Sequence, residues 1–253
     1  LKENGEFVDK WMGIFHDSGF VNYKTILTFD ENGEYNWSKP EPYLSAYRDI
    51  ETYSGICEVE CVRSNMGMGD ELCLIARCNK KRNTSLLIFS TDEGETWSKP
   101  VEAPVSLNGE RHKAEWLPDG RLFITFRSIE RNKKMVRKMR KDGGKKTWYS
   151  EGWIAWVGTY DDLKNGKEGQ YRIKIAHTYL DHQKVPSLSA NADTGYCGNV
   201  VLKDGTVVTS SYGIFSPEEK ERGKYDTDKG KQKRKTFIVS KRIKLDDVEK
   251  FIK

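Results

Sequence analysis

One type of segment occurs three times in this chain, and the repetition limits the folds open to it. Each copy reads as a strand, a tight turn and a second strand, and the copies cover residues 58–77, 111–127 and 196–212. In the second and third copies an Asp-Gly pair supplies the left-handed backbone of a two-residue hairpin. A hairpin that recurs at spacings of 53 and 85 residues predicts repeated blades and argues against a single sandwich.

The rest of the chain also reads as all-β. Helical periodicity is almost absent, and short strand-like runs are separated by clusters of Gly, Asp, Asn and Pro. The predicted strands are residues 23–29, 56–62, 72–77, 85–89, 122–126, 153–160, 171–177, 199–202, 207–211 and 237–240.

A second repeated element predicts a particular turn. Residues 90–97 match the pattern S-x-D-x-G-x-T-W without a mismatch, and residues 30–37 are a degenerate copy. We expect Asp92 to cap the amides of a turn between the third and fourth strands of a blade, and Trp97 to be largely buried beneath it. Both copies end in Trp and continue with Ser-Lys-Pro, whereas residues 142–148 form a third and weaker copy.

The positions of these elements give a count of blades. The pattern predicts half a blade up to about residue 50 and further blades that begin near residues 55, 110 and 195. Propellers close with roughly four to eight blades. We therefore expect residues 1–253 to form one propeller domain that covers about three and a half blades and lacks its N-terminal blades, or an unusual short form.

The charge distribution and the spacing of the cysteines limit which partners, metal sites and disulfides the sequence predicts. The net charge of +5 arises largely from two basic stretches, 131–146 and 220–235, in which aromatic residues do not alternate with the charges. These stretches read as solvated loops, and we predict no nucleic-acid partner. The five cysteines include no C-x-x-C pair, so neither a zinc site nor a disulfide framework is predicted. One cross-strand disulfide and fully reduced cysteines both remain open, and no metal or cofactor is implied.

No run of 18 apolar residues is present, so no membrane span is predicted. No signal peptide is visible either, but the chain begins at Leu1 and not at Met. The compartment therefore stays open, and a secreted or periplasmic bacterial protein is compatible with the sequence.

These motifs resemble the sialidase (neuraminidase) superfamily, in particular the bacterial exo-α-sialidase-like proteins with BNR repeats, in which the S-x-D-x-G-x-T-W pattern is called an Asp box. The resemblance also rests on Trp-Met-Gly-Ile-Phe-His-Asp at 11–17, Gly-Ile-Cys-Glu at 55–58, Glu-Arg-His-Lys-Ala at 110–114 and Gly-Tyr-Cys-Gly at 195–198. It implies a six-bladed propeller. It also implies a Tyr nucleophile activated by a Glu, an Asp acid/base, and three Arg residues that hold the sugar carboxylate.

Three functional roles of sialidases can be assigned to residues of this sequence that stand at matching positions. By resemblance Tyr196 is the nucleophile, Glu58 is its activating carboxylate, with Glu60 as a nearby alternative, and Arg77 binds the substrate carboxylate. The chemistry is sound, because a carboxylate can take the proton of a phenol that attacks an anomeric carbon, and an Arg offers a bidentate fork to a carboxylate.

The sequence also departs from the sialidase pattern. No clear third Arg precedes Tyr196, since Arg140 and Arg172 fit poorly, and Asp17 is only a remote candidate for the acid/base. Arg111 and His112 occupy a pocket-lining position where a sialidase does not require them, and Arg127 ends a strand as Arg77 does. We expect Arg111, Arg127 and His112 to contact substrate.

Three functions follow for a glycan or acidic-sugar partner. The leading hypothesis is an exo-acting glycoside hydrolase of sialidase type. The first alternative is a uronate-directed hydrolase or polysaccharide lyase in which His112 and Tyr196 form the acid/base pair. The second is a non-catalytic carbohydrate-binding propeller.

Overall fold

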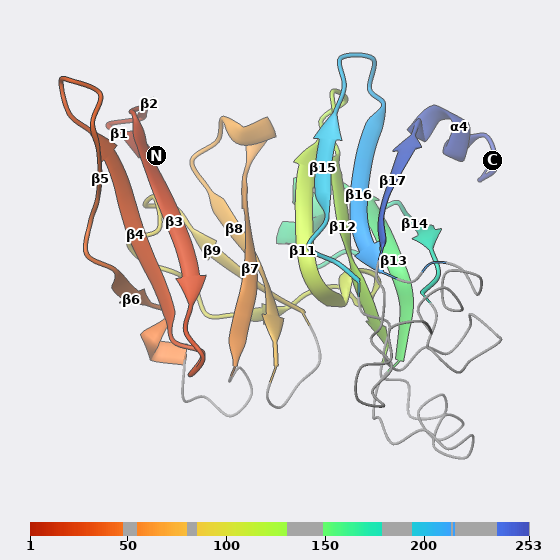
Figure 1. The fold of residues 1–253 in the computed structure, drawn as a ribbon, viewed down its shortest axis with the longest axis horizontal. Helices are drawn as coiled ribbons and strands as arrows, with labels where there is room; N and C mark the ends of the chain where they lie inside the picture. The colour runs from red at the N-terminus through yellow and green to blue at the C-terminus, as the bar shows by residue number, and fades with distance from the viewer. Residues whose placement is uncertain are drawn as a thin grey trace, which may run out of the picture. The chain divides into compact units, whose positions relative to one another are not determined.

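The computed structural model describes residues 1–47, 55–79, 85–130, 149–178, 194–213, 215 and 237–252. The chain divides into two compact units, residues 1–103 and residues 104–253, and each is described by itself. Both units consist of antiparallel sheets whose strands follow one another in sequence (Figure 1). Both basic stretches and the third copy of the turn motif lie outside the described residues.

The first sheet of unit 1 has three strand positions. It begins with β3 (Lys10–His16), continues with β4 (Asn22–Phe29), and ends with β5 (Tyr35–Trp37) and β6 (Glu41–Tyr43), which both pair with β4. A two-stranded ribbon, β1 (Lys2–Glu3) with β2 (Glu6–Phe7), precedes it, and the 3-10 turn η1 (Ser45–Tyr47) follows.

The second sheet of unit 1 is a complete four-stranded blade. Its strands are β7 (Ile56–Arg63), β8 (Leu72–Cys78), β9 (Ser85–Ser90) and β10 (Val101–Glu102), with the 3-10 turn η2 (Asn65–Gly67) between β7 and β8. Both faces of β8 and β9 are buried, which explains why these segments read as continuous apolar runs.

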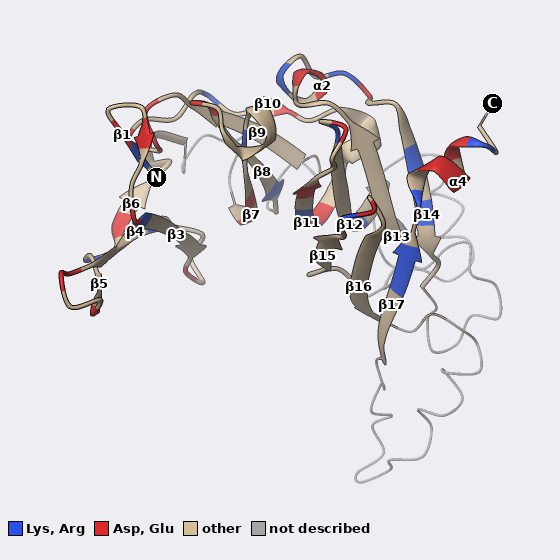
Figure 2. Ribbon diagram, turned by 90° about the horizontal axis from the view of Figure 1, so that it is seen from above, with Lys and Arg blue, Asp and Glu red and all other residues tan. Residues whose placement is uncertain are grey.

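Unit 2 also holds two sheets. The first is four-stranded, with β11 (Gly109–Trp116), β12 (Leu122–Glu130), β13 (Tyr149–Gly158) and β14 (Tyr171–Ala176). The second is three-stranded, with β15 (Gly198–Val201), β16 (Val207–Gly213) and β17 (Phe237–Ile243). The remaining elements are η3 (Val105–Leu107), α2 (Tyr160–Lys164) and α4 (Leu245–Glu249). Charged residues mark β17 and α4, whereas the sequence of β16 contains none (Figure 2).

Within each unit the neighbouring sheets pack through buried contacts. In unit 1, β3 lies against β7, and the side-chain amide of Asn22 donates to the carbonyl of Ile56 at 3.1 Å. In unit 2, β11 lies against β15, and the Asn199 amide donates to the Lys113 carbonyl at 2.9 Å. Within each unit these contacts join consecutive antiparallel sheets as neighbouring propeller blades are joined, and the chain is all-β.

The predicted turn forms between β9 and β10. Asp92 accepts hydrogen bonds from the Thr96 amide at 2.9 Å and the Thr96 hydroxyl at 2.5 Å, and Gly94 adopts φ +85°. Trp97 is partly buried, less than predicted, and packs against the core of unit 1. The degenerate copy forms a similar turn between β4 and β5, where Asp30 accepts from the amides of Asn32 and Glu34 at 2.8 and 2.9 Å.

Alignment on these two turns shows which strand the first sheet lacks. The turn follows the third strand of the complete blade, so β4 corresponds to β9 and β3 corresponds to β8. The innermost position, which β7 occupies in the complete blade, has no strand among the described residues of the first sheet. The sequence predicted only half a blade here, and the structure adds β3 beside β4, so three of the four strand positions are filled.

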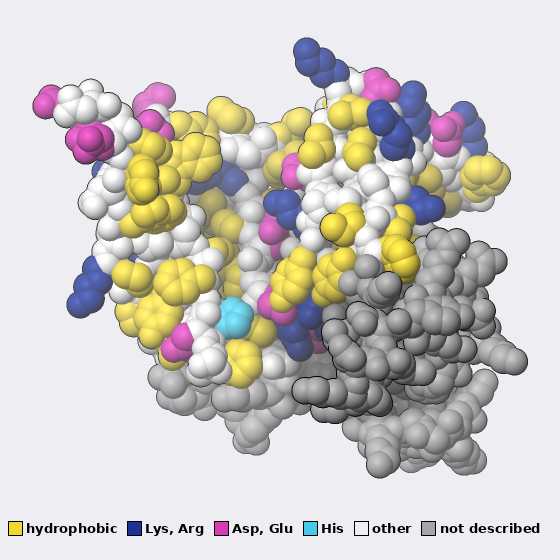
Figure 3. Space-filling model, in the orientation of Figure 1, with side chains coloured by type: hydrophobic (Ala, Val, Ile, Leu, Met, Phe, Trp, Pro, Cys, Tyr) yellow, Lys and Arg dark blue, Asp and Glu magenta, His cyan; other side chains and the backbone are white. Residues whose placement is uncertain are grey.

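One face of the first sheet exposes aromatic side chains. Leu27 is the register partner of both Trp11 and Trp37, so these three residues share one face of the sheet. Phe29 and Tyr35 pair with each other two residues further along their strands and lie on the same face. Trp11 is 63% exposed and Tyr35 is 71% exposed. Hydrophobic side chains gather over these strands in Figure 3. The opposite face packs on the second sheet, where Lys24 bonds to the Gly94 carbonyl at 3.2 Å and to Glu95 at 2.8 Å.

Candidate functional site

The three hairpin-start residues share a rare backbone conformation. Glu58, Arg111 and Tyr196 have φ of 50°, 61° and 48°, in the left-handed region that residues other than glycine seldom adopt. Such conformations each cost on the order of 1 kcal/mol or more and cluster at functional sites. Because the same strain recurs at aligned positions of three hairpins, it supports their equivalence independently of the sequence pattern.

Glu58 and Arg77 form an ion pair in unit 1. Glu58 lies in the register irregularity between Cys57 and Glu60, which turns its side chain out of the regular alternation of β7. Arg77 Nη1 donates to Glu58 Oε2 at 2.9 Å, and Arg77 Nη2 donates to Asn79 Oδ1 at 2.9 Å. The side chains are 12% and 19% exposed, so the pair is strongly held yet open to one side.

Arg111 organises the corresponding region of unit 2. It lies in the irregularity between Glu110 and Lys113, and its Nη1 donates to the Thr194 carbonyl at 2.9 Å and to the hydroxyl of Tyr212. Its guanidinium carbon lies 4.4 Å from the centroid of the Tyr196 ring. Arg111 therefore joins the starts of two neighbouring innermost strands to the end of β16.

Tyr196 is presented at the surface by a rigid support. Tyr196 is 60% exposed, whereas Thr194, two residues earlier, is fully buried. Ser211 holds the segment before it, because its hydroxyl accepts from the Gly195 amide at 3.1 Å and lies 3.0 Å from the Thr194 hydroxyl. A phenol that is exposed on a fixed backbone is suited to contact a ligand.

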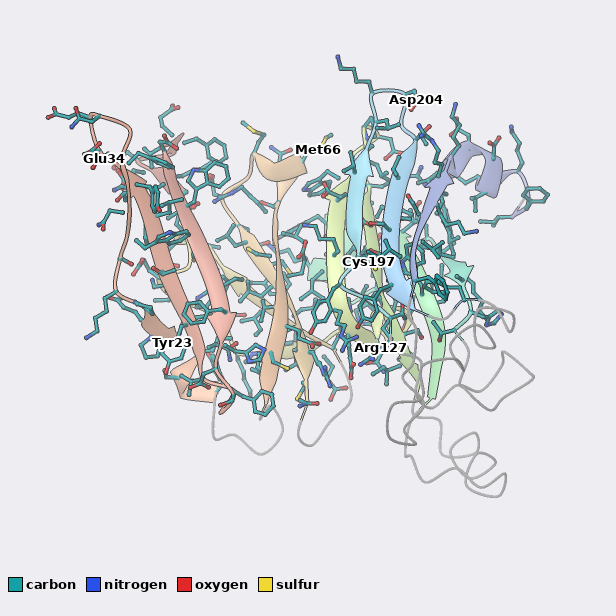
Figure 4. The ribbon with its side chains drawn as sticks, viewed as in Figure 1. Tyr23, Glu34, Met66, Arg127, Cys197 and Asp204 are labelled. Atoms are coloured by element: carbon teal, nitrogen blue, oxygen red, sulfur yellow. The ribbon has the colours of Figure 1, made fainter. Side chains whose placement is uncertain are left out.

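Arg127 is paired with Glu110. The two residues are cross-strand partners at the end of β12, and their side chains are 8% and 9% exposed. A buried, hydrogen-bonded pair of this kind holds an Arg rigidly. Figure 4 places Arg127 at the end of its sheet opposite to Asp204, which lies in the turn between β15 and β16.

His112 is held in the interior of unit 2. It is 6% exposed, its ring stacks on Phe126 at a centroid distance of 5.2 Å, and its Nε2 lies 3.0 Å from the Leu107 carbonyl. A carbonyl only accepts, so Nε2 carries the proton in this bond. These contacts favour a role in packing, and substrate contact by His112 stays a prediction.

The weaker candidates have other contacts. Asp17 caps its own turn, since its Oδ1 accepts from the amides of Gly19 and Val21 at 2.8 and 2.9 Å. Arg172 donates to the Ser128 hydroxyl at 3.2 Å, and Arg140 lies outside the described residues.

Sequence reasoning missed Tyr212 and Glu110, which contact Arg111 and Arg127. Tyr212 ends the second strand of its hairpin, as Arg77 and Arg127 do in theirs. The alignment of the three hairpins already contained that signal. Glu110 immediately precedes Arg111 and had no comparable pattern to mark it.

Three general findings complete the site. No group of three or more His, Cys, Asp or Glu residues in the described ranges is arranged to hold a metal ion. Among these same residues, no helix has the length and apolar character that a membrane crossing requires. All five cysteines are free thiols, so the possible cross-strand disulfide does not form.

The described elements define an all-β protein built from antiparallel, blade-like sheets. Comparisons with protein-family models and with curated protein sequences find no match. The solved structures that it resembles include a Dyadobacter fermentans protein of unknown function, with a TM-score of 0.47, 16% identity, and coverage of 82% of this chain and 46% of the other.

Two further similar structures are sialidases by name. The phage phi92 endosialidase has a TM-score of 0.47 and 14% identity, with 93% of this chain and 34% of the other covered. The NanB sialidase of Streptococcus pneumoniae has a TM-score of 0.45 and 13% identity, with 82% and 26% covered. The chain thus spans less than half the length of each of these three proteins.

Proposed function

We propose that this protein is an exo-acting glycoside hydrolase of sialidase type that removes terminal acidic sugars from glycans. The observation that carries the proposal is Tyr196, an exposed phenol on a strained, firmly supported backbone with the Arg111 guanidinium 4.4 Å from its ring centroid. Phenols are rare nucleophiles in enzymes. The nucleophilic role proposed for Tyr196 therefore also depends on the resemblance of the motifs around this position to those of sialidases.

In the proposed reaction the Tyr196 oxygen attacks the anomeric carbon as the glycosidic bond breaks, and the leaving oxygen takes up a proton from water to depart as an alcohol. Glu58 takes the phenol proton, and water later hydrolyses the glycosyl–tyrosine intermediate. The guanidinium of Arg111 favours negative charge as it develops on the phenol oxygen.

The arginines supply recognition of an acidic sugar. Arg77, Arg111 and Arg127 stand at hairpin ends, and each is held by a carboxylate, carbonyl or hydroxyl of the protein. A guanidinium that is fixed by such bonds loses little conformational entropy when it binds a substrate carboxylate. We propose Arg111 for this contact in unit 2, with Arg127 held rigidly beside its hairpin, and Arg77 as the corresponding candidate in unit 1.

The alternatives are less well supported by the geometry. A uronate-directed hydrolase or lyase needs His112 as an acid or base, but its Nε2 proton is committed to the Leu107 carbonyl. A carbohydrate-binding propeller without catalysis uses the same arginines and makes no demand on the Tyr196 oxygen.

The exposed aromatic face bears on the organisation of the domain. We propose that a further blade, supplied by residues that precede this sequence, covers Trp11, Tyr35 and Trp37. Two observations support it: the opposite face of the same sheet already packs on the next blade, and the innermost strand position is unfilled among the described residues.

Substitution of Tyr196 by Phe tests the proposed reaction. In the protein as its complete gene encodes it, we expect Tyr196→Phe to abolish turnover of a fluorogenic sialoside while binding of the acidic sugar persists, because only the nucleophilic oxygen is lost. Tyr35→Phe, a matched change at an exposed position, should retain full activity. Full activity in Tyr196→Phe would rule out the mechanism. Loss of activity in His112→Ala, with Tyr196→Phe active, would favour the uronate-directed alternative.

A further inference from the structure

Unit 1 contains a pocket that the proposed reaction does not use. It has a volume of about 410 Å³ and is lined by residues 20–23, 42–45, 55 and 56, and we call it the Asn22 pocket. Small-molecule pockets commonly measure roughly 300–1,000 Å³. The pocket adjoins the strand of Glu58, because Ile56 lines it and precedes Glu58 by two residues. In Figure 4 Tyr23, one of its lining residues, lies at the end of β4 away from Glu34.

Two buried polar atoms of the lining residues have no hydrogen-bond partner in the described part of the chain. They are Asn22 Oδ1 and the Tyr43 hydroxyl, and their residues are only 5% and 6% exposed. The orientation of the Asn22 amide is set by its nitrogen, which donates to the Ile56 carbonyl at 3.1 Å. A buried polar atom without a partner costs roughly 1–3 kcal/mol, so both atoms favour an incoming group that can bond to them.

The backbone around the pocket is also strained. Phe20 and Leu44 line the pocket with φ of 62° and 59°. Left-handed backbone at two such residues is uncommon and is typical of ligand sites. Since both polar atoms are buried, occupation of the pocket requires a small movement of its wall, and relief of this strain would lower the cost of that movement.

The chemistry of the lining selects a neutral ligand. None of its residues is charged, and the lining combines the aromatic residues Phe20 and Tyr23 with the polar residues Asn22, Tyr43 and Ser45. Burial raises the pKa of Tyr43 well above its usual value, so this phenol stays protonated and can donate. An apolar, aromatic wall with a few hydrogen-bonding atoms matches a pyranose ring, whose faces are apolar and whose hydroxyls donate and accept.

We infer that the Asn22 pocket binds a neutral sugar residue, the unit of the glycan next to the acidic sugar. This inference rests on the proposed function, because it is glycan recognition that makes a neutral pyranose the relevant ligand. It assigns the acidic sugar to the arginine-bearing hairpin ends and the neutral sugar to the uncharged pocket beside the Glu58 strand.

Binding of methyl β-galactoside and methyl β-glucoside, followed by saturation-transfer NMR titration, tests the inference. We expect at least one to bind the wild-type protein and to bind Tyr43→Phe about 3- to 10-fold more weakly, as expected for one lost hydrogen bond. The melting temperature of Tyr43→Phe should be unchanged or higher, since the hydroxyl has no partner to lose. Tyr35→Phe, the matched control outside the pocket, should bind as wild type does.

A second variant guards against misfolding, and a third separates the two proposals. Ser45→Trp changes an exposed pocket residue and should block binding by filling the pocket. Tyr196→Phe should bind the neutral glycosides normally. If the wild-type protein binds them in a way that depends on Tyr43 but does not turn over a sialoside, the pocket inference is supported and the proposed reaction is rejected. Absence of binding by both glycosides, or equal binding by wild type and Tyr43→Phe, would overturn the inference and leave the pocket to water.

Discussion

The guanidinium carbon of Arg111 lies 4.4 Å from the centroid of the Tyr196 ring, although 85 residues separate the two in sequence. Arg111 is also bonded to the Thr194 carbonyl and to the Tyr212 hydroxyl. One cation therefore fixes the start of β11 against both strands of the β15–β16 hairpin. The relationship makes Arg111 the residue whose replacement should report most directly on the candidate site.

We expect Arg111→Lys to lower kcat/KM for an acidic glycoside by about tenfold, or ~1.4 kcal/mol of transition-state stabilisation. Lysine retains the charge but loses the planar group that faces the Tyr196 ring and the fork that reaches both partners. Steady-state kinetics measures the effect, with Arg242→Lys on the exposed strand β17 as the matched control. Unchanged kinetics in Arg111→Lys would remove Arg111 from the site.

Gly195→Ala should destabilise unit 2 more than an ordinary glycine replacement. Gly195 has φ +114°, and a Cβ there would lie 2.8 Å from Arg111 Cδ. Gly205 has φ +77° with nothing near its Cβ position, so Gly205→Ala incurs only the backbone strain of about 1 kcal/mol. We expect Gly195→Ala to cost about 2–3 kcal/mol in urea unfolding. Equal costs for the two variants would show that Arg111 moves aside freely.

Asp92→Ala should weaken unit 1 by about 1–2 kcal/mol, because the Thr96 amide and hydroxyl lose their acceptor. The same change at Asp30 should cost less. Trp97 packs against the core, whereas Trp37 after the Asp30 turn is 48% exposed. Chemical unfolding followed by tryptophan fluorescence compares the two variants, and a greater loss in Asp30→Ala would contradict this ranking.

Glu93 should make stability depend on pH in the acid range. Hydrogen bonds from Arg63 lower the pKa of Glu93 below its usual range. A carboxyl with a depressed pKa in the folded state stabilises the protein above its unfolded pKa of about 4.3, and that stabilisation is lost as the pH falls through the folded value. Glu93→Gln should therefore be less stable than wild type at pH 7, and the difference should shrink towards pH 3. A difference that does not vary with pH in thermal unfolding would refute this role.

The aromatic face of the first sheet should cause self-association of the chain when residues 1–253 are produced alone. Large exposed apolar patches mark interaction surfaces or sites of aggregation. Sedimentation velocity should show association that Trp11→Gln with Tyr35→Gln reduces. Phe251→Gln, at a side chain that is 91% exposed near the C-terminal end of the sequence, should not change it. A monomeric wild-type chain at high concentration would argue against an uncovered blade face.

Local rules account for the part of the fold that the sequence predicted. Alternation of apolar residues, Asp-Gly turns and the 90–97 pattern act over a few residues, and they yielded the hairpins, the Asp92 turn and the half blade. They missed β3, and they missed α2, which begins with a capping box of Thr159 and Asp162. The same hairpin alignment brought Glu58, Arg77, Arg111 and Tyr196 forward as candidates, because equivalent strand ends bear equivalent residues.

The sequence by itself determined which residues stand at the hairpin ends, because their spacing from each turn is local and periodic. Only the tertiary structure decided what they contact. The hydrogen bonds of Arg111 to Thr194 and Tyr212 and the Asn22 pocket, which is lined from two sheets, depend on how one sheet packs against the next. Packing of that kind joins residues far apart in the chain, and it leaves no periodic trace in the sequence.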